Sequence, residues 1–193
     1  MLLAAALYST GMSTLVAPAP AIPTYNFKDG ETWTFKVKGK AEIQPYGVAG
    51  PLTVKFSKGP KGWMMTLNHK TEMEMNGETG PGQEMTGVFG VDSQLIPDGS
   101  GEGALMFGDQ LLAALAMPTK EEVKLPLLGD AVTFTTKAVE EKEFIKVTSQ
   151  CKGLVGQHVV ERWIDAKTSR LVKAKVVSTM AIGKINYELL PVK

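Results

Sequence analysis

The sequence has few of the residues from which catalytic and metal sites are built. Its 193 residues include one cysteine and two histidines. His69 and His158 occur in separate segments, and neither has an acidic residue at a metal-binding spacing. No serine lies in a G-x-S-x-G motif, the usual setting of a hydrolase nucleophile. We therefore expect a protein that is not an enzyme and that holds no metal or other cofactor.

The single cysteine, Cys151, cannot form an internal disulfide. It has the same parity as Ile145 and Val147 in a strand-like run, which predicts a buried, unreactive thiol. An excess of charge of one sign is also missing, because 21 basic and 20 acidic residues leave a net charge of +1. Such a chain has no field that would concentrate nucleic acid, so we exclude nucleic acid as a partner.

Long hydrophobic runs are absent except at the N-terminus. Residues 1–21 are apolar and end in two overlapping small-x-small sites, which is typical of a secretory leader, although no basic residue precedes the run. We expect cleavage near Ala21, because cleavage after Ala19 would place Pro20 next to the scissile bond. A membrane anchor is the alternative, but polar residues interrupt the run. We expect a secreted or periplasmic protein with no integral membrane span in the mature chain.

The clearest positive feature is period-two alternation of apolar and polar residues, which predicts β-strands. It is strong over residues 30–43, where Trp33, Phe35 and Val37 alternate with polar side chains, and it recurs over residues 52–56 and 63–75. Further strands are predicted at residues 84–91, 129–137, 143–152, 156–165, 170–177 and 185–189. We expect the glycine-rich segments 77–83 and 97–103 to be loops, and residues 119–128 to be a connector.

One segment favours a helix. Residues 104–117 consist of strong helix formers, are apolar on nearly all sides, and are stopped by Pro118. A helix of this kind must be covered, most simply by lying inside a concave sheet.

Two pairs of similar segments indicate an internal duplication. Residues 30–38 match residues 129–137 as Gly, acid, two variable positions, Thr, Phe, two variable positions and Lys. A Gly-Gln strand follows each copy, at residues 82–96 and 156–171. We predict a single β-rich domain over residues 22–193, with a first half at 25–103, the helix at 104–117 and a second half at 119–193.

The expected fold class is therefore mainly β, a curved antiparallel half-barrel or open sandwich of about nine strands with one short helix between two similar halves. Each half would have one apolar face that cannot be exposed to water, so the two halves must close on each other.

A late hairpin motif, W-x-D-x-x-[ST]-x-x-L, occurs at Trp163, Asp165, Thr168 and Leu171. Together with the leader, the Gly-acid-x-Trp-Thr opening at residues 30–34 and the mid-chain helix, it resembles secreted bacterial β-proteins of uncharacterised function. It resembles, more distantly, the LolA/LppX/LprG class of lipoprotein and lipid carriers. The resemblance implies a curved half-barrel that covers a helix over an apolar cavity, and it identifies no binding residue. The LppX and LprG members are lipid-anchored through a cysteine that this sequence lacks after its leader, so a soluble periplasmic carrier is the closer analogue.

Methionine is more frequent than in an ordinary β-domain: the chain has ten, and seven of them lie in the first half and around the helix. Its flexible side chain adapts to irregular apolar partners, so these residues either fill gaps between imperfectly matched sheets or form a plastic pocket. Under the second interpretation, the candidate ligand-binding residues are Trp33, Phe35, Met65, Met73, Met75, Met85, Phe89, Met106 and Phe107.

Two functions are consistent with these features. The first is non-catalytic binding of an apolar ligand, a lipid or acyl chain, or a lipidated partner. The second is a structural or adaptor domain with a filled core that binds another protein through a sheet edge.

Overall fold

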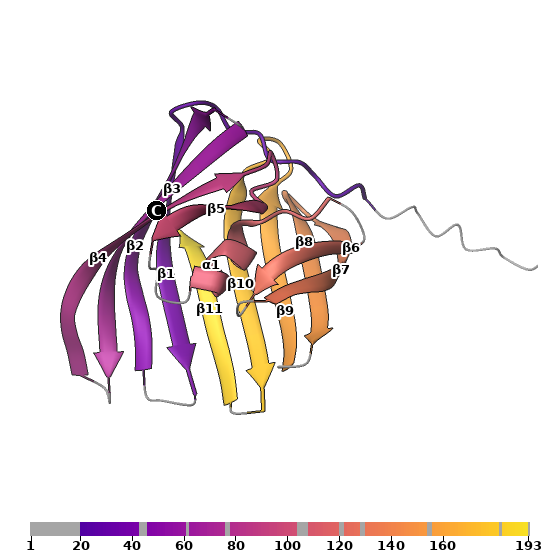
Figure 1. The fold of residues 1–193 in the computed structure, drawn as a ribbon. Coiled ribbons are helices and arrows are strands. Elements are labelled where there is room, and N and C mark those ends of the chain that lie inside the picture. The colour runs from indigo at the N-terminus through magenta and orange to yellow at the C-terminus, as the bar shows by residue number, and fades with distance from the viewer. Residues whose placement is uncertain are drawn as a thin grey trace, which may run out of the picture.

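A single open antiparallel sheet of eleven strands, with one short helix on its concave side, makes up the fold (Figure 1). The structure is a computed structural model. It describes residues 20–42, 46–60, 62–75, 78–103, 108–119, 122–127, 130–153, 156–181 and 183–192. The predicted leader, residues 1–21, falls almost entirely outside the described residues.

The sheet consists of two meanders joined by its first and last strands. The first contains β1 (Thr32–Ala41), β2 (Tyr46–Gly59), β3 (Gly62–Met75), β4 (Glu78–Val91) and β5 (Pro97–Gly103), and is followed by α1 (Gly108–Leu115). The second contains β6 (Glu122–Leu127), β7 (Asp130–Glu141), β8 (Phe144–Gly153), β9 (Gly156–Asp165), β10 (Leu171–Met180) and β11 (Gly183–Pro191). Because β1 pairs with β11, the strand order is β5-β4-β3-β2-β1-β11-β10-β9-β8-β7-β6. The predicted class, an open, mainly β fold with one short helix, is confirmed, with eleven strands in place of about nine.

The two additional strands are the edge strands β5 and β6. We predicted a loop at residues 97–103 and a connector at residues 119–128, and both predictions were wrong. Gly87 to Phe89 of β4 pair with Gly101 to Gly103 of β5, and β6 pairs with β7 over its whole length. The predicted loop at residues 77–83 was also too long, since β4 begins at Glu78. Strand β5 has no alternation of side chains, whereas β6 alternates over six residues that include Pro126.

Alternation of burial along the strands separates a concave inner face from an outer face. In β1 the burial alternates strictly, with Trp33, Phe35 and Val37 inside and Thr34 and Lys36 outside. Cys151 is buried on the same face as Val147, as its parity predicted. The register shifts within the β3–β4, β4–β5 and β9–β10 pairs. Such irregularities increase local twist and bend, and they help the sheet to curve.

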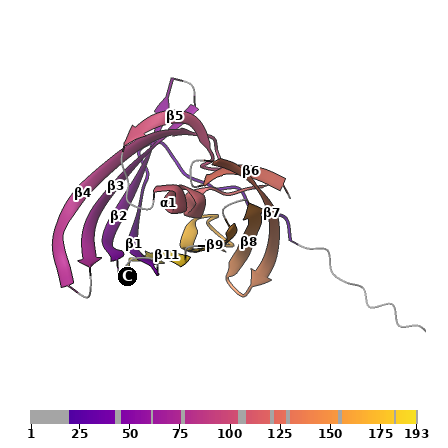
Figure 2. The same ribbon diagram turned by 60° about the horizontal axis from the view of Figure 1, so that its bottom comes forward.

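Helix α1 lies within the arc of the sheet, which Figure 2 shows from below. Its residues from Gln110 to Leu115 are buried, and it contacts β6, β9, β10 and β11. This confirms the expectation that the apolar segment ending before Pro118 is covered by a concave sheet. A helix of eight residues is too short to be stable alone, so its packing and the side chains that bind its carbonyl groups must hold it in place.

The segment that precedes β1 closes one end of the sheet. Tyr25, Phe27, Trp33, Phe56 and Trp63 form an aromatic cluster, with ring centroids 4.4–6.1 Å apart in the contacting pairs. Tyr25 is therefore part of the folded core, and Ile22 and Phe27 pack against it.

The β9–β10 hairpin has the predicted turn. The side chain of Asp165 accepts hydrogen bonds from the backbone N–H of Lys167 and Thr168 and from the Thr168 hydroxyl, and these bonds hold the pKa of the exposed Asp165 carboxyl below its usual value. The matched segments of the proposed duplication begin in β1 and β7 and continue in β4 and β9. They are three strands apart in the first half and two strands apart in the second, and the duplication stays a prediction about the sequence.

Candidate functional site

The concave face has one wall that the helix covers and one that it leaves partly open. Helix α1 packs against β9, β10 and β11. On β3 and β4, the inward-facing side chains of Met73 and Met85 are half-buried, and that of Met75 is 56% exposed. We call Met73, Met75 and Met85 the methionine wall. Met73 lies opposite the buried Val48 of β2, so the wall continues directly from the apolar core.

The predicted ligand-binding residues fall into three groups. Trp33, Phe35 and Met65 are buried in the core, and Phe89 packs against it with part of its surface exposed. The three residues of the methionine wall are the predicted residues that reach solvent on the concave face. Met106 and Phe107 lie outside the described residues. The structure thus places the accessible part of the predicted set on β3 and β4, away from the aromatic end.

A fully buried arginine, which the sequence reading did not identify, holds the helix against the opposite wall. Arg162 of β9 has no exposed surface. Its Nη2 donates a hydrogen bond to the Ala113 carbonyl oxygen at 2.6 Å, and its Nη1 donates to Ser149 Oγ at 2.9 Å. Thr136 Oγ1 donates to the same serine oxygen at 3.1 Å. Burial lowers the pKa of Arg162 to about 10, so the guanidinium remains charged at neutral pH.

The position of this cation suits the end of the helix. Helix α1 has no basic residue in its own last turn, where partial negative charge accumulates on the free carbonyl groups. Arg162 supplies a positive charge there from β9, and the Tyr25 hydroxyl donates a hydrogen bond to the Leu115 carbonyl oxygen at 2.8 Å. Two side chains from distant parts of the sequence therefore fix the C-terminal turn of α1.

A second set of buried side chains on the concave face forms a row across three strands. His158 of β9 lies opposite Cys151 of β8 and Ser178 of β10. The side chains of His158 and Ser178 are at most 1% exposed. Neither ring nitrogen of His158, nor Ser178 Oγ, has a hydrogen-bond partner among the described residues. Burial lowers the pKa of His158 and raises that of Cys151, which favours the uncharged form of both.

The other buried histidine, His69, lies on β3 among apolar neighbours, as predicted from the alternation. Burial lowers its pKa, and the Ala49 backbone partly offsets that effect. Within the described part of the chain, no three His, Cys, Asp or Glu side chains gather closely enough to hold a metal ion.

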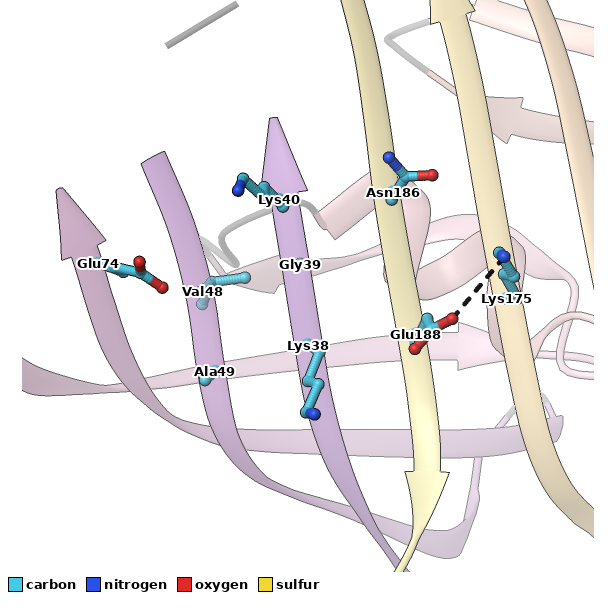
Figure 3. Close-up of a pocket in the computed structure, with 9 residues that line it drawn as sticks. All are labelled: Lys38, Gly39, Lys40, Val48, Ala49, Glu74, Lys175, Asn186 and Glu188. Carbon is cyan, nitrogen blue, oxygen red and sulfur yellow. Dashed lines mark ion pairs between the residues drawn. The ribbon is translucent and has the colours of Figure 1, made fainter. Parts of the chain in front are cut away.

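The outer face of the sheet carries a separate, charged hollow of about 520 Å³ (Figure 3). Lys38 and Lys40 of β1 border it, and Lys175 forms an ion pair with Glu188 at 3.9 Å. These side chains lie on the surface and mix both signs of charge, so water satisfies them readily. The hollow is on the opposite face of the sheet from the methionine wall.

No helix in the described ranges has the length and hydropathy needed to cross a bilayer. Searches against protein-family models, curated proteins and solved structures find no match for this chain. The geometry of the concave face is therefore the basis on which a function is inferred.

Proposed function

We propose that this protein is a non-catalytic, extracytoplasmic carrier that binds an acyl chain or a lipidated partner on the concave face of its sheet. The observation that carries the proposal is the methionine wall. An apolar strip that continues the core and yet reaches solvent is a surface that an apolar ligand would cover. Methionine side chains have three rotatable bonds and a polarisable sulfur, and they adapt to a flexible chain better than branched residues do.

The helix gives the site its second boundary. Helix α1 is joined to the sheet by contacts with β6 and β9–β11 and by hydrogen bonds to its C-terminal carbonyl groups. A ligand on the methionine wall would cover strands β3 and β4, which are not among the main contacts of α1. A longer ligand would have to displace α1, which requires breaking the bonds from Arg162 and Tyr25.

The location of the protein is part of the proposal. The apolar leader with its small-x-small sites supports export, with cleavage near Ala21. The resemblance to the LolA/LppX/LprG class supports the other part of the proposal, lipid binding, because members of that class bind lipids within a curved open sheet.

An adaptor that binds through a sheet edge is the weaker alternative. The edge strand β5 contains Gly99, Gly101 and Gly103, all with positive φ, which interrupts the regular ladder that an added strand would extend. In β6, the other edge strand, Pro126 has no backbone N–H to donate. Both edges are therefore poor templates for strand addition.

The test is lipid binding by the purified mature protein and by one matched pair of variants. Met85→Gln replaces an inward-facing side chain of the methionine wall with a polar side chain of similar length. The control, Thr86→Gln, places the same side chain one residue away, on the outer face of the sheet. Native mass spectrometry and titration with a fluorescent apolar probe, N-phenyl-1-naphthylamine, would measure occupancy and affinity.

We expect the wild-type protein and Thr86→Gln to bind the probe equally, and Met85→Gln to bind it about tenfold more weakly, which corresponds to the burial of roughly two methylene groups. If the wild-type protein neither retains a hydrophobic species nor binds the probe, the carrier proposal is wrong.

A further inference from the structure

Two buried polar side chains on the concave face, His158 and Ser178, have no hydrogen-bond partner among the residues that the structure describes. In native proteins nearly all buried polar groups form hydrogen bonds, and each exception calls for an explanation. Atoms of His69, Gln110 and Arg162 are further exceptions. His158 and Ser178 are the two that the register of β9 and β10 places opposite each other, so their Cβ atoms are about 4.5–5.5 Å apart. A buried donor or acceptor that lacks a partner disfavours the folded state, and this pair contributes three such atoms.

The same row leads to the open part of the sheet. Ser178 pairs with Ile185 of β11, Ile185 pairs with Ala41 of β1, and the row continues through β2 to Met75. Ser178, Ile185 and Ala41 are buried on the concave side, and Met75 is 56% exposed. The polar pair thus shares one row of the curved face with Met75, while Met85 lies opposite His69, farther along the same face.

We propose that His158 and Ser178 form a subsite that binds the uncharged, hydroxyl-bearing head of a lipid whose acyl chain lies along the methionine wall. This inference depends on the proposed carrier function and specifies the class of its ligand. A neutral imidazole offers one donor and one acceptor, and a serine hydroxyl offers both in one atom. Their complement is a group that also donates and accepts, such as the hydroxyl of an acylglycerol or of a long-chain alcohol.

Electrostatics disfavour an anionic head in this subsite. Burial keeps His158 uncharged at neutral pH, so it provides no positive charge. The buried cation on the same strand, Arg162, is four residues from His158, about 13 Å along β9, and its terminal nitrogens donate to Ser149 and Ala113. A carboxylate or phosphate moved into this apolar setting would lose its hydration without forming an ion pair with that cation. The ligand is therefore an uncharged lipid and not a fatty-acid anion.

The experiment compares two probes that share a twelve-carbon acyl chain, monolauroylglycerol and laurate, by displacement of N-phenyl-1-naphthylamine at pH 7.5. We expect the wild-type protein to bind monolauroylglycerol about tenfold more tightly than laurate, because each neutral hydrogen bond contributes a factor of roughly two to ten. In Ser178→Ala combined with His158→Leu, this preference should disappear while laurate affinity stays within about twofold of wild type.

A stability measurement separates a ligand-binding role from a structural one. Ser178 and Ser149 are both fully buried on the concave face, but Ser149 Oγ is held by Arg162 and Thr136 whereas Ser178 Oγ has no partner among the described residues. Without ligand, Ser178→Ala should leave the denaturation midpoint unchanged or raise it, and Ser149→Ala should lower it. A subsite residue behaves in this way because its polar group is satisfied only when ligand is bound.

The outcomes distinguish the inference from the function on which it depends. If the wild-type protein binds both lipids but with equal affinity, or if Ser178→Ala leaves the preference intact, the subsite is wrong and the carrier function stands. If the wild-type protein binds neither lipid nor the fluorescent probe, both proposals are wrong. If the double variant does not fold, the lipid preference is measured in Ser178→Ala alone, which removes only one oxygen atom.

Discussion

Replacing Tyr25 with phenylalanine tests how firmly the helix is held in the sheet. The change removes one oxygen atom and keeps the ring that packs edge-on against Trp33, with centroids 5.3 Å apart. It deletes the hydrogen bond of 2.8 Å from the Tyr25 hydroxyl to the Leu115 carbonyl oxygen, at the end of α1. Packing is therefore preserved, and the effect of the substitution reports on that single bond.

The expected loss follows from the burial of both partners. Tyr25 and Leu115 are both buried, so water cannot replace the lost donor. A buried carbonyl group left without its donor costs about 1–3 kcal/mol, and we expect Tyr25→Phe to lower the free energy of unfolding by about 2 kcal/mol. For a domain of this size, the midpoint of thermal unfolding should fall by roughly 4–8 °C.

Urea denaturation followed by tryptophan fluorescence measures the effect. Tyr25→Leu serves as a comparison, because it removes the same bond and also the aromatic contacts, and it should cost clearly more than Tyr25→Phe. The slope of unfolding free energy against urea should stay the same in Tyr25→Phe, since the folded state buries the same surface. A change of less than 0.5 kcal/mol in Tyr25→Phe would show that this bond does not hold α1 in place.

Two further predictions concern the other buried polar residues. Arg162→Lys keeps the charge, but one ammonium group cannot reach both Ala113 and Ser149 as the guanidinium does. The free energy of unfolding in urea should therefore fall by about 2 kcal/mol. A denaturation midpoint equal to that of wild type would contradict the role given to Arg162. Burial lowers the pKa of His69 and His158 in the folded state. Below pH 6.5 the unfolded chain therefore binds protons at these histidines more readily than the folded chain does. The free energy of unfolding should be highest above about pH 6.5 and decrease as the pH falls toward about 5. The slope is at most about 1.4 kcal/mol per pH unit for each histidine, and an unchanged pH dependence in His158→Leu would refute the contribution of that residue.

Alternation in the sequence was enough to predict the central strands, and a run of strong helix formers before Pro118 was enough to predict the helix. The inward positions of β1, including Trp33 and Phe35, follow directly from it, because a half-buried strand must alternate. The edge strands could not be predicted in this way. Strand β5 reads PDGSGEG, which has no alternation, and only backbone pairing with β4 reveals it. Strand β6 reads EVKLPL, which does alternate, but the run is only six residues long and contains Pro126, which argues against a strand.

The candidate site was predictable only in part. Composition drew attention to methionine, but which methionines reach solvent depends on where α1 lies, and the sequence does not contain that information. Arg162 was missed and His158 was considered only as a metal ligand, although both have the parity of the buried Val160 and Ile164 in β9. A charged or titratable residue at an inward position of a strand is worth separate attention. The absence of a partner for His158 depends on register, and no local pattern encodes it.

The pairing of β1 with β11 has a consequence for how the chain reaches its folded state. The two strands at the centre of the sheet come from opposite ends of the domain, so the two meanders cannot be joined until residue 191 has left the ribosome. Joining strands so far apart in sequence also makes folding slow, because a long loop must close before the contacts form. For a chain that is exported, as we propose, this delay leaves the two meanders unjoined during synthesis, when translocation needs an unfolded polypeptide.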